Sequence, residues 1–146
     1  MPVLKKSRLQ VNSTSPLDKV LSWFEQLHQP QIPKSVWIRC QLALAEGFTN
    51  AVRHAHKDKA WDLPIEIEVE VFAESIEMKI WDWGDKFDLE QKIAEISQQV
   101  DLESGGGRGL KLMKDIADSL TYSRTPGDRN CLSIVKHYDP IPKAED

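Results

Sequence analysis

Residues 65–71 read IEIEVEV, a strict alternation of β-branched apolar and acidic side chains. A period of two indicates a strand with one buried face, because successive side chains point to opposite sides of a sheet. Residues 75–82 (SIEMKIWD) repeat the alternation after the short turn at 73–75. The two segments therefore predict an antiparallel hairpin, in which the glutamate row forms the solvated face and carries no chemistry.

Further elements are predicted on both sides of this hairpin. Residues 3–12 alternate as a first strand, and Ser13–Thr14–Ser15–Pro16 offers an N-cap and a first-turn proline for a helix ending near His28. A long helix is expected from about 34 to 57, and a polar, partly helical stretch over 85–104. A glycine-rich start at 105–109 then leads into another helix, and LTYSR from Leu120 and CLSIVKHY from Cys131 predict two closing strands.

These elements predict one domain over residues 1–138, followed by a flexible tail at 139–146 that is acidic and broken by proline. The expected fold is α+β, a two-layer sandwich in which a mixed, largely antiparallel sheet is covered by helices on one face. A composition of 40% apolar and 29% charged residues excludes wholesale disorder.

Charge, cysteines and hydropathy narrow the class of protein. A formal net charge of −4 argues against direct binding of nucleic acid. Cys40 and Cys131 lie in apolar patterns without metal-ligand spacing, which predicts buried thiols rather than a disulfide. No apolar run is long enough to span a membrane and no signal-peptide core is present, so a cytoplasmic location is expected.

The long helix carries the first candidate site. Glu46, Asn50 and His54 follow one another at intervals of four and fall in one row on a helix. A small, apolar stripe suited to close packing on a sheet runs beside this row; its residues are Val36, Cys40, Ala43, Gly47, Ala51 and Ala55. Taken alone, such a triplet is also typical of a solvated helix face.

Two further segments carry residues that could contribute to a binding site. Asp82-x-Gly84 follows the hairpin, where an acid can accept a hydrogen bond from an exocyclic amine and a glycine lets a flat ligand approach, although the same pattern is a common turn. The cluster at 105–109 presents backbone N–H groups at a helix start, which suits an anion or, equally, a hinge. Its spacing excludes a P-loop, since no Lys-Ser or Lys-Thr follows.

Together, E-x-x-x-N on a helix, D-x-G after a hairpin and a glycine-rich helix start resemble the Bergerat-fold (GHKL) ATP-binding superfamily. Within that superfamily, the segments AEGFTNAVRHA, DWGDKFD and GGGRGLKLM look most like the bacterial anti-sigma-factor serine/threonine kinases. The resemblance extends over roughly residues 5–138. One departure concerns the second glycine that many members carry after D-x-G-x, because here Lys86 and Phe87 follow instead. This predicts a stiffer lid hinge, with Lys86 available to the phosphates.

The resemblance implies a role for each residue. Glu46 would be the general base, and Asn50 would bind a Mg²⁺ that bridges the ATP phosphates. Asp82 would accept from the adenine amino group, with Gly84 against the base. The segment closing over the phosphates would comprise Gly105, Gly106, Gly107, Arg108 and Gly109, with Leu110 beginning the helix. His54 continues the row near the nucleotide, with a structural polar contact as its expected role.

The resemblance also implies an activity and partners. The expected protein binds ATP and Mg²⁺, sequesters a sigma factor, phosphorylates an antagonist protein and forms a homodimer. An alternative is a nucleotide-gated regulator of a non-sigma target that lacks significant kinase activity. A histidine-kinase catalytic domain is a third interpretation, disfavoured because no upstream helical hairpin carries a phosphoacceptor histidine.

Overall fold

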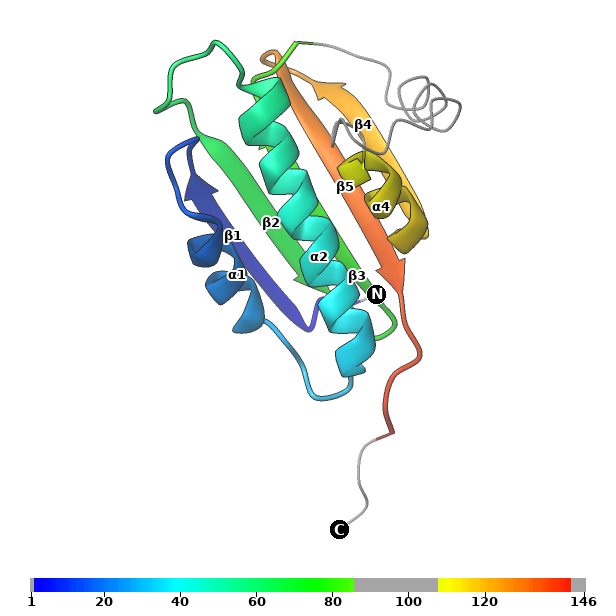
Figure 1. Cartoon of the computed structure of the whole chain (residues 1–146). Helices are drawn as coiled ribbons and strands as arrows, with labels where there is room; N and C mark the ends of the chain where they lie inside the picture. Colours follow the sequence, from blue (N-terminus) through cyan, green and yellow to red (C-terminus); the bar gives the residue numbers. More distant parts are fainter. Residues whose placement is uncertain (1, 86–107, 143–146) are drawn as a thin grey trace.

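The computed structural model describes residues 2–85 and 108–142 of the 146-residue chain (Figure 1). The predicted polar segment after Asp85, including Lys86 and Phe87, and the glycines at 105–107 lie outside these ranges. The side chains of His54 and Arg108 also lie outside what is described.

Five strands form one sheet in the order β1-β2-β3-β5-β4, and every pairing among them is antiparallel. The strands are β1 (Lys5–Val11), β2 (Ile65–Val71), β3 (Ser75–Asp82), β4 (Ser119–Thr125) and β5 (Arg129–His137). The hairpin predicted from the alternation is β2–β3, and β5 inserts between β3 and β4.

The helices lie together on one face of this sheet (Figure 1). They are α1 (Leu17–Glu25), α2 (Lys34–Asn50) with its π-helical continuation η1 (Ala51–Ala55), and α4 (Arg108–Ile116). In Figure 1, α2 lies between α1 and α4. The described part of the chain therefore confirms the predicted two-layer α+β fold. Within it, no helix is long and apolar enough to cross a membrane.

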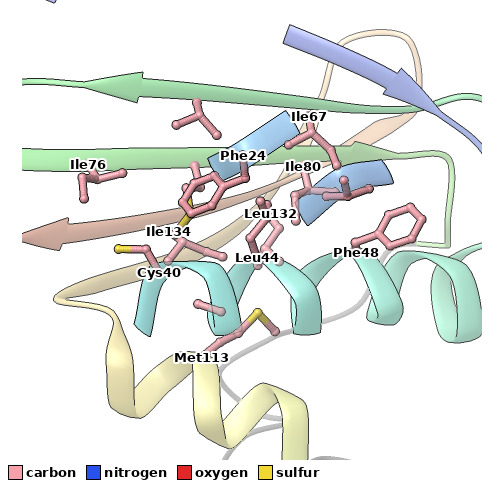
Figure 2. Close-up of a cluster of buried hydrophobic side chains, with 14 of the residues drawn as sticks. Phe24, Cys40, Leu44, Phe48, Ile67, Ile76, Ile80, Met113, Leu132 and Ile134 are labelled. Carbon is pink, nitrogen blue, oxygen red and sulfur yellow. The ribbon is translucent and has the colours of Figure 1, made fainter. Parts of the chain in front are cut away.

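The core lies between the helices and the inner sheet face (Figure 2). Phe24 of α1 stacks on Trp37 of α2, with ring centroids 4.1 Å apart. A Cβ added to Gly47 would lie 2.5 Å from Ile80 Cδ1 and 3.6 Å from Met113 Sδ, so this glycine lets α2 approach both β3 and α4. The apolar stripe of α2 is thus confirmed as a packing face, and both cysteines are buried free thiols as predicted.

Some local predictions were wrong. Helix α1 begins after Pro16 without a side-chain cap, because Ser15 Oγ instead accepts from the N–H of Asn12. The helix ends at Glu25, before His28.

The outer face of the sheet also differs from the prediction of a simple solvated row. Glu68 is only 5% exposed, because Arg8 and Lys6 of the neighbouring β1 cover and pair with its carboxylate. Burial raises the pKa of Glu68, but the hydrogen bonds with Arg8 and Glu70 and the charges of Arg8 and Lys6 together leave this pKa below its ordinary value. Arg8 also lies over the ring of Trp81, 5.0 Å from its centroid.

Candidate functional site

The polar row of α2 begins as the sequence predicts. Glu46 and Asn50 are one turn apart on α2, half-buried, while the adjacent stripe of Ala43, Gly47 and Ala51 is buried against the rest of the core. Packing of the small stripe on the sheet therefore fixes the direction in which the polar row points. The α-helical spacing ends at Asn50.

The next residues, Ala51–Ala55, form the π-helical segment η1. The N–H of His56 donates to the carbonyl of Ala51 over 2.8 Å, which is a hydrogen bond five residues back along the chain. This wider turn changes the angular spacing that placed His54 in the row with Asn50. Single π turns inside helices frequently occur at functional sites, which is consistent with a site at the end of α2.

Asp82 lies at the end of β3 and is 2% exposed. Its Oδ1 accepts from the N–H of Gly84 at 2.8 Å and from Nδ2 of Asn130 at 3.0 Å. The phenol of Tyr122 donates to the carboxylate, 2.8 Å from Oδ2 and 3.1 Å from Oδ1. Burial, and after it the charge of Asp82, raises the pKa of Tyr122, so the phenol keeps its proton and remains a donor.

The same network fixes the turn after Asp82. The carbonyl of Gly84 accepts from Asn130 Nδ2 at 2.8 Å and from Arg124 at 3.0 Å. A Cβ on Gly84 would lie 2.7 Å from the Cβ of Ala55 and 2.9 Å from its Cα, so the turn packs directly on η1. This contact provides a structural reason for glycine at position 84, beside the predicted approach of a flat ligand.

His56 ties η1 to this turn from a second side. Its Nε2 accepts from the backbone N–H of Trp83 at 2.9 Å, and the residue is 3% exposed. Burial lowers the pKa of His56, so the imidazole is neutral and its Nδ1 carries the proton.

The start of α4 approaches the polar row of α2. Arg108 opens the helix, as the glycine-rich sequence predicts, and Leu110 is buried in the core. A Cβ on Gly109 would collide with the carboxylate of Glu46. The first turn of α4, where backbone N–H groups lack helical partners, therefore lies directly beside the candidate base.

The structure thus arranges the predicted residues along one helix. Gly109 contacts Glu46 one turn before the end of α2, and Gly84 contacts Ala55 in η1. Glu46 and Ala55 are nine positions apart in the chain, about 13 Å at the rise of an α-helix. An extended nucleoside triphosphate can bridge such a span.

Four residues of the site were missed from the sequence: His56, Tyr122, Arg124 and Asn130. One signal was present, because Asn130 shares the inward parity of Leu132 and Ile134 in an otherwise apolar strand. A polar side chain at a core-facing position needs a hydrogen-bonding partner, and Asp82 is paired opposite it in the sheet.

Chemically, the arrangement offers a buried acceptor for an exocyclic amine at one end. At the other end it offers an anion-binding helix start beside a carboxylate. Asn50 lies on α2 four residues beyond Glu46 and supplies an amide oxygen, a ligand type that Mg²⁺ accepts. Because Mg²⁺ usually binds one or two protein oxygens together with substrate phosphates, the residues present fit a magnesium nucleotide.

Comparisons with known proteins identify the family of the chain. Residues 12–136 match the model of the histidine kinase-like ATPase domain. A serine-protein kinase RsbW of Staphylococcus aureus is 34% identical over 92 residues, which cover 60% of this chain and 58% of the relative. The RsbW of Bacillus subtilis (strain 168) is 37% identical over 93 residues, covering 60% and 57%. The aligned part of the chain thus spans less than two thirds of these relatives.

A solved structure shares the fold. A chain in the crystal structure of the SiaB–SiaC complex from Pseudomonas aeruginosa superposes with a TM-score of 0.64, covering 91% of this chain and 89% of that one. Sequence identity is 14%, so this similarity concerns the fold alone. The matches to serine-protein kinases confirm the family resemblance predicted from the three motifs.

Proposed function

The chain belongs to the histidine kinase-like ATPase domain family, and from this membership we propose that it is an ATP-dependent serine/threonine protein kinase acting as an anti-sigma factor. In this proposal a homodimer sequesters a sigma factor in the cytoplasm and phosphorylates a serine or threonine of an antagonist protein, using MgATP. Relatives named serine-protein kinase support the activity. The sigma factor and the antagonist enter through the resemblance of the motifs.

One observation carries the proposal. Gly109, at the start of α4, lies against the Glu46 carboxylate, so a general base sits beside a helix start able to bind phosphate. With any side chain at position 109, a Cβ would take the space of that carboxylate. A side chain at position 109 would therefore force the Glu46 carboxylate to shift, whereas glycine leaves it in place.

Each residue has a task in this mechanism. Glu46 accepts the proton of the attacking hydroxyl, and Asp82 accepts a hydrogen bond from the adenine amino group. The first turn of α4 directs backbone N–H groups at the phosphates, and the Asn50 amide oxygen holds the metal. When bound, MgATP supplies the phosphoryl group, and its metal neutralises phosphate charge.

The direct test is transfer of ³²P from ATP to an antagonist domain mixed with the full chain. We expect Glu46→Gln to reduce transfer at least about 100-fold while ATP affinity stays close to that of the wild type, because general-base catalysis contributes a factor of that order. Asn50→Ala should lose both transfer and the magnesium dependence of ATP binding.

Lys114→Ala serves as the matched control, because this exposed residue lies in the last turn of α4, away from the proposed site. Its transfer rate should equal that of the wild type. Unchanged transfer by Glu46→Gln would contradict the assignment of the base. A wild-type chain that binds MgATP but transfers nothing to any antagonist would instead favour the nucleotide-gated regulator.

A further inference from the structure

We infer that Tyr122 and Asn130 are positioning residues that set the base specificity of the site, by holding Asp82 as an acceptor with its Oδ2 directed at an exocyclic amine. This inference rests on the nucleotide binding in the proposed function and goes beyond it. It assigns a role to two strand residues that no motif of the sequence contains.

The two carboxylate oxygens of Asp82 accept different numbers of hydrogen bonds. Oδ1 accepts from Gly84, Asn130 and, at 3.1 Å, Tyr122, whereas the hydrogen bond to Oδ2 comes from the Tyr122 hydroxyl at 2.8 Å. An ionised carboxylate offers about four acceptor positions, two on each oxygen. Counting the contacts from the described residues, the remaining capacity lies on Oδ2, which identifies the atom that would accept from a ligand.

Asn130 fixes both the carboxylate and the turn beneath it. Its Nδ2 donates to Asp82 and to the carbonyl of Gly84, at 3.0 and 2.8 Å. Its Oδ1 accepts from Arg124 at 3.3 Å, which distinguishes the oxygen of the amide from the nitrogen. A rotation of the Asn130 amide would break these contacts together, because this one buried group makes them all.

The contacts with Tyr122 and Asn130 use the carboxylate as an acceptor, because both residues donate to it. Adenine presents an amino group at position 6, whereas guanine presents a carbonyl oxygen there, which the carboxylate repels. A carboxylate that rotates away from that position would repel the guanine oxygen less, and the discrimination would weaken.

The test measures ATP and GTP affinities of the full chain by calorimetry. We expect Tyr122→Phe to lower the ratio of ATP to GTP affinity about tenfold, mainly through weaker ATP binding, because one donor to a charged acceptor is lost. Ser123→Ala is the matched control. This neighbouring side chain on β4 is exposed, and its removal should leave the ratio unchanged.

A second variant adds a readout that a purely structural role would not move. Asn130→Asp places another carboxylate about 3 Å from Asp82, where two like charges share a proton at low pH. The shared proton replaces the lost amide donor, so we expect the ATP preference to fall as the pH rises from 5 to 8. Among the described residues, the other titratable groups near this pair include Arg124, Tyr122, His56 and Cys131, and all four remain in the variant.

Variants that fold and weaken both nucleotides equally, with an ATP-to-GTP ratio equal to that of the wild type at every pH, would overturn the inference. A wild-type chain that binds neither nucleotide would overturn both the inference and the proposed function. If the variants change the ATP-to-GTP affinity ratio as expected but the wild-type chain transfers no phosphoryl group, the inference would be supported and only the kinase activity would be contradicted.

Discussion

His56 shows how burial gives a single residue its function in the fold. Its neutral Nε2 accepts from the N–H of Trp83, and burial is the main cause of its lowered pKa, with Lys59 acting in the same direction and Asp82 against it. A protonated imidazole has no lone pair for this bond. The contact between η1 and the turn after β3 therefore depends on the imidazole remaining neutral.

We predict that stability falls as the pH drops below about 6.5, the ordinary histidine value. The folded chain binds the His56 proton less readily than the unfolded chain does, so this contribution is complete above 6.5 and is lost as the pH falls toward the folded-state pKa. Urea denaturation between pH 7.5 and 5 measures the slope, at most about 1.4 kcal/mol per pH unit for one proton.

His56→Gln is the comparison, because a glutamine oxygen can accept from Trp83 without titrating in this range. Its stability should vary less with pH than that of the wild type. Equal pH dependence in the two proteins would show that other groups cause the slope.

At this scale the sequence predicted residues whose role depends on local spacing. Glu46 and Asn50 follow from α-helical periodicity, which holds until Asn50, and Asp82 from its position at a strand end. Tyr122 and Asn130 could not be placed before the register of β4 and β5 against β3 was known. His56 was missed because a π turn cannot be foreseen from a period of 3.6.

Among the elements, η1 and the turn after β3 are joined by the closest backbone approach of the site, at Gly84 and Ala55. Of the three nearest atoms to an added Cβ at Gly84, one is the Ala55 Cβ and the others are backbone Cα and carbonyl O, 2.9 and 3.0 Å away. Since backbone atoms cannot rotate aside, η1 or the turn would have to move.

We therefore predict that Gly84→Ala destabilises the fold by about 1–3 kcal/mol, as overpacking does, and also weakens ATP binding. The double variant Gly84→Ala with Ala55→Gly removes one of the three close atoms. Denaturant unfolding and nucleotide titration should show only partial recovery. Full recovery would mean that the side chains alone are in conflict, and no effect of Gly84→Ala would contradict the close approach.

The elements themselves were largely predictable. The hairpin β2–β3 follows from strict alternation, and β5 from its apolar pattern. The predicted N-cap of α1 was wrong because the Ser15 hydroxyl accepts from the N–H of Asn12, and local hydrogen bonds of this kind compete with helix capping. The predicted end of the long helix was wrong because the contacts of His56 with Trp83 and of Ala55 with Gly84 favour the π turn.

For the molecule as a whole, the two faces of the sheet are stabilised differently. The inner face is covered by helices, whereas the outer face covers Glu68 with the chain's own cations. The Arg8 side chain is 58% exposed and that of Glu68 only 6%, so solvent screens one partner more than the other. The pair should therefore contribute less than a fully buried one.

We predict that Arg8→Met destabilises the chain by about 1–3 kcal/mol, because it leaves the buried Glu68 carboxylate with Lys6 at 3.8 Å as its remaining cation among the described residues. Replacing Glu68 with Met as well removes the unpaired charge and should restore most of the loss. Urea unfolding of both variants provides the measurement. A single variant as stable as the double one would contradict this account.

At this scale the sequence predicted the layers and the all-helical cover, since both follow from amphipathic patterns. A single domain over residues 1–138 with a flexible tail remains a prediction, as do the homodimer and the protein partners. Such properties depend on surfaces and on other molecules, which no periodicity encodes. The burial of Glu68 was not predicted, because it depends on β1 lying next to β2 and placing Arg8 opposite Glu68.

The position of β5 has a consequence for synthesis on the ribosome. Among the described residues β5 is the last strand in sequence, yet it lies between β3 and β4 and contributes Asn130 to the contacts of Asp82. A nascent chain that has exposed only the first three strands therefore presents an unpaired β3 edge, a template for aggregation. Premature termination before residue 129 should produce fragments that depend on chaperones and bind no nucleotide.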